Sequence, residues 1–427
     1  MAAAASTGTT PTAIGSRSSP GRTAVAAPDP ADCEVLVVGA GPAGSACAQT
    51  LARAGLDVLL VDRQDFPREK VCGDGLIPDA QRALARLGVL DAVLARAAVA
   101  SHVGCVAPRG GRLEVPARLA VLPRRELDEI VRRAALEAGA RWFAPARFEA
   151  PLADANGRVA GGRLRLADGT ARELRARWTV LATGAAAPPL LAADMCRRRV
   201  PSGVALRGYV MNEAMAGRLR QLEVVWDRAL RGGYGWIFPC GGGVFNIGVG
   251  SLKGEGGSEP DLNLRELFAA FTRVHAPARE LMQGGRLQGE PKGAPLRCSL
   301  EGARWSRPGL LVAGEAAGST YSFTGEGIGK ALESGMLAGE AIAGAGADDA
   351  AAGARYEAAL TALRPRFAAY EHANRINNHP WIADFVIWRA RRSPGIVRRL
   401  SGVLEESYSP GQLVTARGLL RLLLPVS

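Results

Sequence analysis

The chain has 427 residues, 48% of them hydrophobic, with 53 lysines and arginines against 41 aspartates and glutamates. A chain of this length and composition can bury one large core or two moderate ones, so we expect a globular protein with two interlocked domains. The net charge of +12 is spread along the chain without zinc-finger spacing or an RNA-binding motif, which argues against nucleic-acid binding.

Residues 1–30 are mostly Ala, Ser, Thr, Pro and Gly, with two arginines and no acidic residue before Asp29. So little apolar surface does not offset the entropy of ordering, and we expect a disordered tail. The acid-poor composition also fits an organelle transit peptide, which we keep as the minority alternative.

The first structured unit is expected at the apolar run Val35–Val38, which leads into Gly39-Ala40-Gly41-Pro42-Ala43-Gly44 and a helix of small residues. Gly39 permits a tight turn, Gly41 lets the backbone approach a pyrophosphate, and Gly44 lets helix and strand pack closely. The helix N-terminus offers free N–H groups to phosphates. Asp62 closes the next strand, 18 residues after Gly44, and is placed to accept hydrogen bonds from a ribose diol. The unit predicts a bound dinucleotide, either NAD or FAD.

Later apolar runs continue an α/β pattern. Residues 179–182 and 309–313 stop at Gly184 and Gly314 and are typical of strands buried on both faces. Between them, 204–210, 222–226 and 244–249 are predicted as antiparallel strands. We therefore expect a Rossmann-like nucleotide-binding domain interrupted by an antiparallel-sheet substrate domain. The expected segments are the tail (1–30), the nucleotide-binding domain in two parts (31–190 and 295–345), the substrate-binding sheet (191–294) and a C-terminal helical region (346–427).

The second nucleotide motif decides between NAD and FAD. The strand at 310–313 is followed by Gly314-Glu315-Ala316-Ala317-Gly318. This resembles the second FAD motif of the p-hydroxybenzoate-hydroxylase-like flavoproteins, in which an acid, usually Asp where Glu315 stands, holds the ribityl chain. Gly325-Glu326-Gly327-Ile328-Gly329 resembles the start of the helix that faces the flavin's pyrimidine end. The resemblance implies FAD as the cofactor.

Two other segments are compared with the same flavoproteins: one resembles their pattern and the other departs from it. Arg124-Arg125-Glu126-Leu127 resembles the Arg-x-x-Leu segment whose arginine lies near the flavin phosphates, here Arg124. The alternative is an arginine on a solvated helix N-terminus. Ala182-Thr183-Gly184 stands where related hydroxylases carry an Asp-Gly motif that helps with NADPH, which argues against NADPH use in the hydroxylase manner.

Three segments narrow the class further. Lys70-Val71-Cys72-Gly73-Asp74-Gly75 resembles Lys-x-Cys-Gly-x-Gly of the geranylgeranyl reductase family. The run 234–239 resembles that family's Tyr-x-Trp-x-Phe-Pro element, which lines its substrate cavity, and 324–328 resembles its Thr-Gly-Glu-Gly-Ile. The resemblance implies FAD-dependent reduction of isoprenoid C=C bonds, with electrons from NADPH or another donor. The candidate cofactor-binding residues are Gly39, Gly41, Pro42, Ala43, Gly44, Asp62, Arg63, Lys70, Cys72, Gly73, Arg124, Ala182, Thr183, Gly184, Gly314, Glu315, Gly325, Gly327 and Ile328.

The candidate catalytic residues are Cys72, Tyr234 and Trp236. Hydride transfer from a reduced flavin to an alkene needs a proton donor at the other carbon, or a group that relieves the developing charge. Cys72, aligned with the cysteine implicated in the family, is the candidate donor; the alternative is a small apolar residue in a tight turn. Tyr234 and Trp236 alternate, so on a strand they share a face and could wall an apolar cavity, or be ordinary core aromatics.

The rival functions share this fold. An FAD-dependent monooxygenase (hydroxylase) or dehydrogenase acting on a small secondary metabolite would have the same FAD site. A halogenase is disfavoured because the run 234–239 lacks the first Trp and the Ile of Trp-x-Trp-x-Ile-Pro. A catalytically idle flavin- or lipid-binding module is the third class. Tyr321-Ser322-Phe323 departs from the family's proline in this loop, so we expect specialisation there.

The C-terminal region is basic and rich in leucine. Residues 388–400 include five arginines, and 413–426 add Arg417 and Arg421 among leucines. Such a segment could lie on an anionic membrane surface or cover the core with its arginines solvated. No apolar run approaches the roughly 18 residues that span a bilayer, so the expected location is cytoplasmic, with any membrane contact peripheral on the inner face. The sequence does not predict an oligomeric state.

Metal binding is not expected. The seven cysteines are scattered and never form CxxC, which also argues against a disulfide framework. His372 and His379 have no carboxylate or cysteine partner nearby in the sequence.

Overall fold

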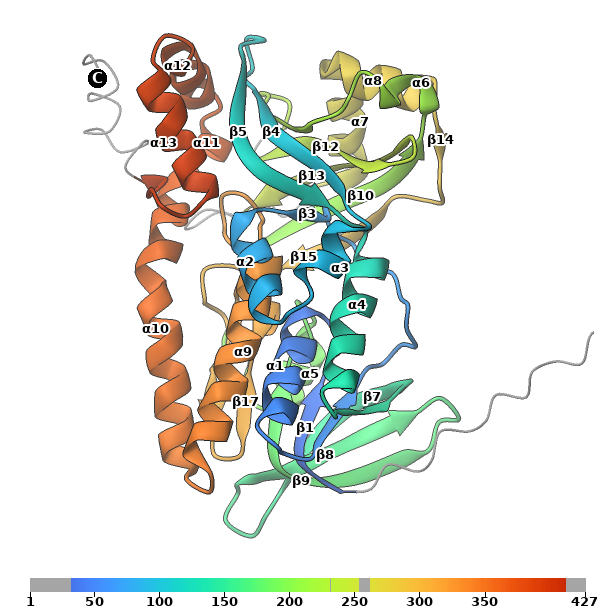
Figure 1. Ribbon diagram of the computed structural model, residues 1–427, viewed down its shortest axis with the longest axis vertical. Coiled ribbons are helices and arrows are strands. Elements are labelled where there is room, and N and C mark those ends of the chain that lie inside the picture. Colours follow the sequence, from blue (N-terminus) through green and yellow to red (C-terminus); the bar gives the residue numbers. More distant parts are fainter. Residues whose placement is uncertain (1–31, 231, 253–261, 412–427) are drawn as a thin grey trace, which may run out of the picture.

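The computed structural model describes residues 32–230, 232–252 and 262–411. The tail expected over 1–30 and the leucine-rich segment 413–426 lie outside the described residues. Within the described ranges the chain forms two sheets, one above the other in Figure 1, with long helices along one side. The described helices include none that is long and apolar enough to cross a membrane.

The first sheet is the nucleotide-binding sheet predicted from the sequence. Its strands are β1 (Cys33–Val38), β2 (Val58–Val61), β6 (Arg141–Phe143), β7 (Ala146–Ala153), β8 (Val159–Leu166), β9 (Ala171–Leu181), β16 (Ser306–Arg307) and β17 (Leu310–Val312). The order is β16-β17-β9-β1-β2-β6, with β8 on β9 and β7 on β8. Pairing from β17 to β6 is parallel. The runs expected at 179–182 and 309–313 match the end of β9 and β17, which are buried as such runs require.

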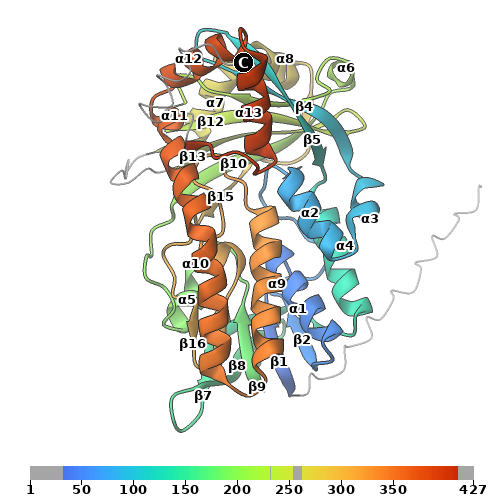
Figure 2. The same cartoon turned by 60° about the vertical axis from the view of Figure 1, so that its left-hand side comes forward.

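Four helices form a layer beside this sheet: α1 (Pro42–Arg53), α4 (Arg124–Glu137), α9 (Ile328–Ala345) and α10 (Asp349–Ala373). Figure 2 shows α10 alongside α9, and α9 alongside α1. The contact between α1 and α9 depends on a small residue, because a Cβ on Gly335 of α9 would lie 2.1 Å from the Ala43 carbonyl oxygen of α1. This contact places the middle of α9 against the start of α1.

The second sheet has nine strands in the order β14-β10-β13-β12-β11-β4-β5-β3, with β15 also on β10. Its strands are β3 (Gly75–Leu76), β4 (Ala98–Val106), β5 (Arg112–Val121), β10 (Gly203–Met211), β11 (Leu222–Val225), β12 (Gly233–Gly241), β13 (Val244–Leu252), β14 (Arg286–Leu287) and β15 (Lys292–Leu296). The runs expected at 204–210, 222–226 and 244–249 correspond to β10, β11 and β13. Pairing is antiparallel except between β11 and β4.

The second sheet contains strands from outside the segment 191–294 that was expected to form it. Strands β3, β4 and β5 come from within 31–190, which was assigned wholly to the nucleotide-binding domain, and β15 extends past 294. The alternating burial of β5 carries the period-two signal of a half-buried strand. The two domains are therefore interleaved twice in the sequence, since a β-sheet accepts strands from any part of the chain.

The remaining helices are short. They are α2 (Pro78–Arg86), α3 (Leu90–Leu94), α5 (Ala187–Ala192), α6 (Glu213–Ala216), α7 (Leu264–Val274), α8 (Ala276–Gln283), α11 (Arg375–Asn378), α12 (Trp381–Ala390), α13 (Pro394–Leu404) and the 3₁₀ helix η1 (Gly314–Ala317). Helices α11 to α13 lie at the end of the molecule occupied by the second sheet, beside β5 (Figure 1). This confirms a helical C-terminal region within the described residues.

Candidate active site

A cavity of about 1030 Å³ opens between the two sheets and extends beneath α11, α12 and α13. Of the residues predicted for the site, Gly44 and Gly314 do not line this cavity and the others do. Both exceptions are packing positions: a Cβ on Gly44 would lie 1.7 Å from the Gly39 oxygen, and one on Gly314 would lie 2.6 Å from the Ala43 Cβ. Both glycines therefore lie behind the residues that line the cavity, where the chain packs closely against the start of α1.

The glycine-rich turn between β1 and α1 forms one end of the cavity. Gly39 has φ +100°, and a Cβ there would meet the Ala182 oxygen at 2.4 Å, so a side chain is excluded for two reasons. Gly41 faces open space, because its nearest neighbours are the guanidinium nitrogens of Arg68 and Arg124, 3.5 and 3.8 Å from a Cβ position. Two cations thus face the turn at which a pyrophosphate is expected, which fits a dinucleotide.

Arg124 is buried, only 8% exposed, so the alternative of a solvated helix end is wrong. Its Nε and Nη2 donate to the two carboxylate oxygens of Asp128, at 2.6 and 2.9 Å, one helical turn further along α4. Burial alone would lower the pKa of Arg124, but Asp128 and the Cys72 side chain raise it. The guanidinium is therefore a permanent charge at the cavity wall.

The sequence did not predict Arg68 and Asp128 as site residues. Arg68 Nη1 lies 3.1 Å from Asp128 and its Nη2 lies 3.5 Å from Asp62, so one arginine links both carboxylates. The spacing of Arg124 and Asp128 by four residues was a usable signal for Asp128. Nothing in the local sequence distinguishes Arg68 from the other arginines.

Asp62 holds the turn as well as facing the cavity. Its carboxylate accepts from the backbone N–H of Ala40 at 2.9 Å and of Gln64 at 3.0 Å. Further along the wall, Lys70 Nζ lies 3.7 Å from the Glu315 carboxylate. The buried hydroxyl of Thr183 has no hydrogen-bond partner among the described residues. An unpaired hydroxyl and a cradle without side chains fit a polar, elongated ligand such as FAD.

The turn that carries Cys72 is held by a buried polar network. Asn246 Nδ2 donates to the Cys72 carbonyl oxygen at 2.8 Å and to Asp74 at 2.7 Å. Trp236 Nε1 donates to Asn246 Oδ1 at 2.9 Å, and the Tyr209 hydroxyl donates to Asp74. Burial raises the pKa of Asp74 to about 6, and its φ of 64° places it in the left-handed region. Of these partners only Trp236 was predicted as a site residue, because Asn246 and Tyr209 come from other strands of the second sheet.

Cys72 itself lines the cavity and is partly buried. The Arg124 guanidinium lies close enough to the Cys72 side chain for the two to interact electrostatically. A cation beside a thiol stabilises the thiolate that forms when the thiol gives up its proton. This position is compatible with both roles expected for Cys72, a proton donor and a small residue in a tight turn.

Aromatic side chains wall the cavity beyond Cys72. Tyr234, Trp236 and Phe238 alternate along β12, and their rings are 6.1 and 6.4 Å apart. All three line the cavity, which confirms the predicted shared face of Tyr234 and Trp236. The Tyr234 hydroxyl donates to the Thr324 oxygen, and burial raises its pKa. This part of the cavity is apolar and suits a hydrocarbon chain.

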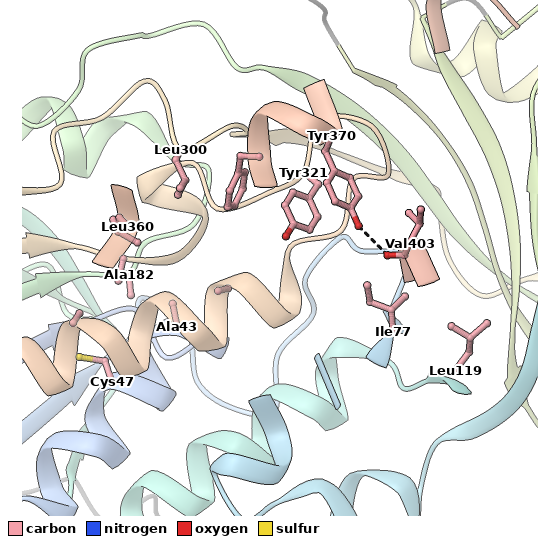
Figure 3. Packing of buried hydrophobic residues seen from close by; sticks show 14 of the residues in the cluster. Ala43, Cys47, Ile77, Leu119, Ala182, Leu300, Tyr321, Leu360, Tyr370 and Val403 are labelled. Atoms are coloured by element: carbon pink, nitrogen blue, oxygen red, sulfur yellow. Dashed lines mark hydrogen bonds between the residues drawn. The ribbon is translucent and has the colours of Figure 1, made fainter. Parts of the chain in front are cut away.

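The loop that departs from the family pattern is fixed to the C-terminal helices. Tyr321 is fully buried and stacks on Tyr370 of α10, with ring centroids 3.8 Å apart (Figure 3). Its hydroxyl donates to Glu406 at 2.7 Å. Phe323 lines the cavity and stacks on Trp226, 6.3 Å away. The loop 321–323 is therefore linked both to the C-terminal region and to the cavity wall.

These features define an FAD-dependent oxidoreductase. A family model described as "FAD binding domain" matches residues 32–201. The menaquinone reductase of Mycobacterium tuberculosis is 36% identical over 333 residues, covering 72% of this chain and 76% of the relative. Digeranylgeranylglycerophospholipid reductase 1 of Methanopyrus kandleri is 32% identical over 321 residues, covering 72% and 79%.

A solved structure supports the fold. The crystal structure of a geranylgeranyl bacteriochlorophyll reductase-like protein from Thermoplasma acidophilum aligns with a TM-score of 0.70 at 22% identity, covering 92% of this chain and 96% of that one. The chain belongs to the geranylgeranyl reductase family of FAD-dependent oxidoreductases, as its motifs indicated.

Proposed function

We propose that this protein reduces C=C bonds in the isoprenoid chain of a lipid or quinone. The observation that supports this most is the continuity of the cavity, which joins the dinucleotide cradle at Gly41 to the aromatic wall of β12 and the apolar faces of α12 and α13. The part of the cavity lined by β12, α12 and α13 is called the hydrophobic arm below. It suits a long chain better than a compact polar molecule. The names of the two relatives, one a quinone reductase and one a geranylgeranyl-lipid reductase, point the same way.

The protein's own residues divide the work as follows. Bound FAD, once reduced, supplies the hydride. Gly41, Arg68 and Arg124 would hold the FAD phosphates, and Lys70 and Glu315 would lie beside the ribityl chain. Tyr234 and Trp236 orient the alkene and exclude water. Cys72 gives the proton to the second carbon of the double bond, and Arg124 balances the thiolate that remains.

The reaction is tested on the purified FAD-loaded protein under argon. After anaerobic photoreduction, we expect geranylgeranyl compounds to reoxidise the flavin without oxygen and to gain two hydrogens per double bond, measured by absorbance and mass spectrometry. A short-chain alkene, which cannot fill the hydrophobic arm, serves as the control and should react more slowly. If reoxidation requires oxygen and yields a hydroxylated product, the protein is a monooxygenase instead.

The electron donor belongs to the same proposal. We propose NADPH or another low-potential donor, with no dedicated NADPH motif, because Ala182-Thr183-Gly184 carries no carboxylate. Comparing flavin reduction by NADPH with reduction by dithionite separates direct use from supply by a partner.

We also propose that the cytoplasmic protein makes peripheral contact with an anionic membrane through α12. The inner face of this helix lines the cavity with Ala383, Val386 and Ile387. Its outer face exposes Trp381 (54%) and Trp388 (48%) to solvent. Tryptophan prefers the headgroup region of a bilayer. One face of α12 therefore lines the cavity, and the opposite face is suited to contact with a membrane surface.

The charged residues next to α12 support the proposed membrane contact. Arg391 and Arg392 are exposed directly after α12, and the Arg392 guanidinium lies 4.8 Å from the Trp388 ring. Basic residues beside interfacial tryptophans are the complement of an anionic lipid surface. Contact there would place the hydrophobic arm of the cavity next to the lipid phase.

The membrane contact is tested with the double variant Trp381→Ala, Trp388→Ala. We expect its partition onto phosphatidylglycerol-containing vesicles to fall at least about tenfold, by co-sedimentation, because two interfacial anchors are lost. The control is Leu191→Ala, since Leu191 is an exposed apolar residue (41%) on α5. Equal binding of wild type and double variant, or equal binding to neutral phosphatidylcholine vesicles, would contradict the proposal.

A further inference from the structure

Glu406 is a carboxylate shortly after α13 that the mechanism above leaves unused, and its side chain is only 4% exposed. We call α11, α12 and α13 together the cover, because the cavity extends beneath them. The φ of Glu406 is 57°, in the left-handed region, which a residue with a side chain adopts mainly where surrounding contacts hold it there. The position of Glu406 therefore depends on its partners.

Four elements contribute partners to the Glu406 carboxylate. Tyr321, in the loop before α9, donates its hydroxyl at 2.7 Å. Lys330 of α9 lies 3.1 Å away, and Arg366 of α10 lies 2.7 Å away. Arg82 of α2 lies 3.4 Å away and is the most exposed partner, at 54%. One carboxylate thus joins the end of the cover to three other helices and to the loop 321–323.

The charges on the inner side of this contact are shared. Lys330, 5% exposed, also lies 2.7 Å from Glu333 and 3.7 Å from Asp79. Burial lowers the pKa of Lys330, but Asp79, Glu333 and Glu406 raise it above its usual value. Without the Glu406 charge, Lys330 keeps two carboxylates, so the packing around it tolerates the loss. The cover, in contrast, loses its charged contact with α9 and α10.

The chain just before Glu406 forms a wall of the hydrophobic arm. The residues of α13 that line the cavity are Leu400, Val403 and Leu404. In the same helix, the Ser401 hydroxyl donates to the Pro116 carbonyl oxygen of β5 at 2.6 Å. The Tyr370 hydroxyl of α10 donates to the Val403 carbonyl oxygen at 3.3 Å (Figure 3). Helix α13 is therefore attached to the second sheet through Ser401, and to α9, α10 and the loop through its end.

The other side of the contact is the loop at which the flavin is expected. The Tyr321 N–H donates to the Glu326 carbonyl oxygen at 2.8 Å, and the Gly325 N–H donates to the Tyr321 carbonyl oxygen at 3.0 Å, which closes the loop into a turn. The residues of this turn that line the cavity include Phe323, Thr324 and Gly325. Glu406 therefore fixes the α13 wall of the hydrophobic arm relative to the loop beside the flavin site.

We propose that Glu406 is a positioning residue that makes the enzyme selective for long isoprenoid chains. This inference rests on the proposed function and specifies its substrate class. Glu406 does not line the cavity, so it acts through α13. A chain long enough to reach α13 gains apolar contact only while that wall is held in place. A short chain lies beside Tyr234 and Trp236 and does not depend on α13.

The experiment uses Glu406→Gln and Tyr321→Phe, singly and together, with Glu405→Gln as the matched control. Glutamine keeps the shape of Glu406 and removes its charge. Phenylalanine removes only the hydroxyl and keeps the ring that stacks on Tyr370. Glu405 is the adjacent carboxylate and is exposed. Each FAD-loaded protein is titrated in the oxidised state, by calorimetry, with geranylgeraniol (four isoprene units) and with geraniol (two).

Wild type should bind geranylgeraniol more tightly than geraniol. We expect Glu406→Gln to weaken geranylgeraniol binding at least about fivefold and geraniol binding less than about twofold, since only the long chain uses the displaced wall. Tyr321→Phe should weaken geranylgeraniol binding about threefold. The double variant should lose less than the product of the two single factors, because both changes remove one contact. Glu405→Gln should match wild type, and FAD affinity should be unchanged throughout.

Turnover gives the second readout. With dithionite as reductant and geranylgeraniol as substrate, the KM of Glu406→Gln should rise by the same factor as its dissociation constant. Its kcat should stay within about twofold of wild type, because the groups at the reacting carbons are unchanged. A general loss of structure would lower kcat and FAD affinity as well.

Three results overturn the inference: unchanged geranylgeraniol binding in Glu406→Gln, equal losses for geranylgeraniol and geraniol, or a parallel loss of FAD affinity. The last two would make Glu406 a general structural residue. The reaction is judged separately. If wild type binds geranylgeraniol but its reduced flavin is not reoxidised by any isoprenoid, the reductase proposal fails and the role of Glu406 in chain binding stands. If wild type binds no isoprenoid, both fail.

Discussion

Replacing Cys72 with alanine is expected to slow the first anaerobic reoxidation of reduced flavin by an isoprenoid about 10²- to 10⁴-fold, the usual contribution of a positioned acid. The physical reason is that hydride transfer leaves negative charge on the second carbon of the alkene unless a proton arrives. The Arg124 guanidinium near the Cys72 side chain would remain, so the positive charge at the site would not be lost. Stopped-flow absorbance of the flavin under argon measures this rate.

Two controls separate chemistry from structure in this experiment. Cys33→Ala removes a thiol at the start of β1, outside the cavity wall, and should leave the rate unchanged. Thermal unfolding of Cys72→Ala should match wild type, because the turn is held through the Cys72 backbone oxygen by Asn246 and not through sulfur. A first-turnover rate equal to wild type would assign Cys72 to packing only.

Replacing Gly44 with alanine is expected to destabilise the protein by more than about 3 kcal/mol, beyond the usual cost of an overpacked core. The added Cβ would lie 1.7 Å from the Gly39 carbonyl oxygen, and backbone on both sides prevents relief. The strand β1 and helix α1 would have to separate, which also opens the cradle. Chemical denaturation of the FAD-free protein measures the change in the free energy of unfolding.

Gly41→Ala is the matched variant three residues earlier. Its φ of −74° suits alanine, and the nearest atom to the new Cβ is 3.5 Å away, so the free energy of unfolding should change little. The methyl group would occupy the place at which the phosphates approach, so FAD affinity should fall at least about tenfold. Equal stability of both variants, or unchanged FAD affinity in Gly41→Ala, would contradict the assigned roles of these glycines.

The amino-acid sequence identified the parts of the site that are local. The turn 39–44 works through its backbone conformation, which the local sequence determines. Gly39, for example, adopts φ +100°, a conformation that glycine takes up readily and other residues do not. The same holds for Cys72 in its glycine-rich turn and for Tyr234 and Trp236, whose spacing alone places them on one face of a strand. Motif order along the chain then indicated FAD and the family.

The tertiary structure alone decided which distant groups meet these parts. Arg68 faces the phosphate turn, and Asn246 and Tyr209 hold the Cys72 turn. It also decided that β3, β4 and β5 belong to the second sheet. Such contacts depend on how strands and helices pack, and packing joins residues far apart in sequence through shape and burial, which leave no local spacing to recognise.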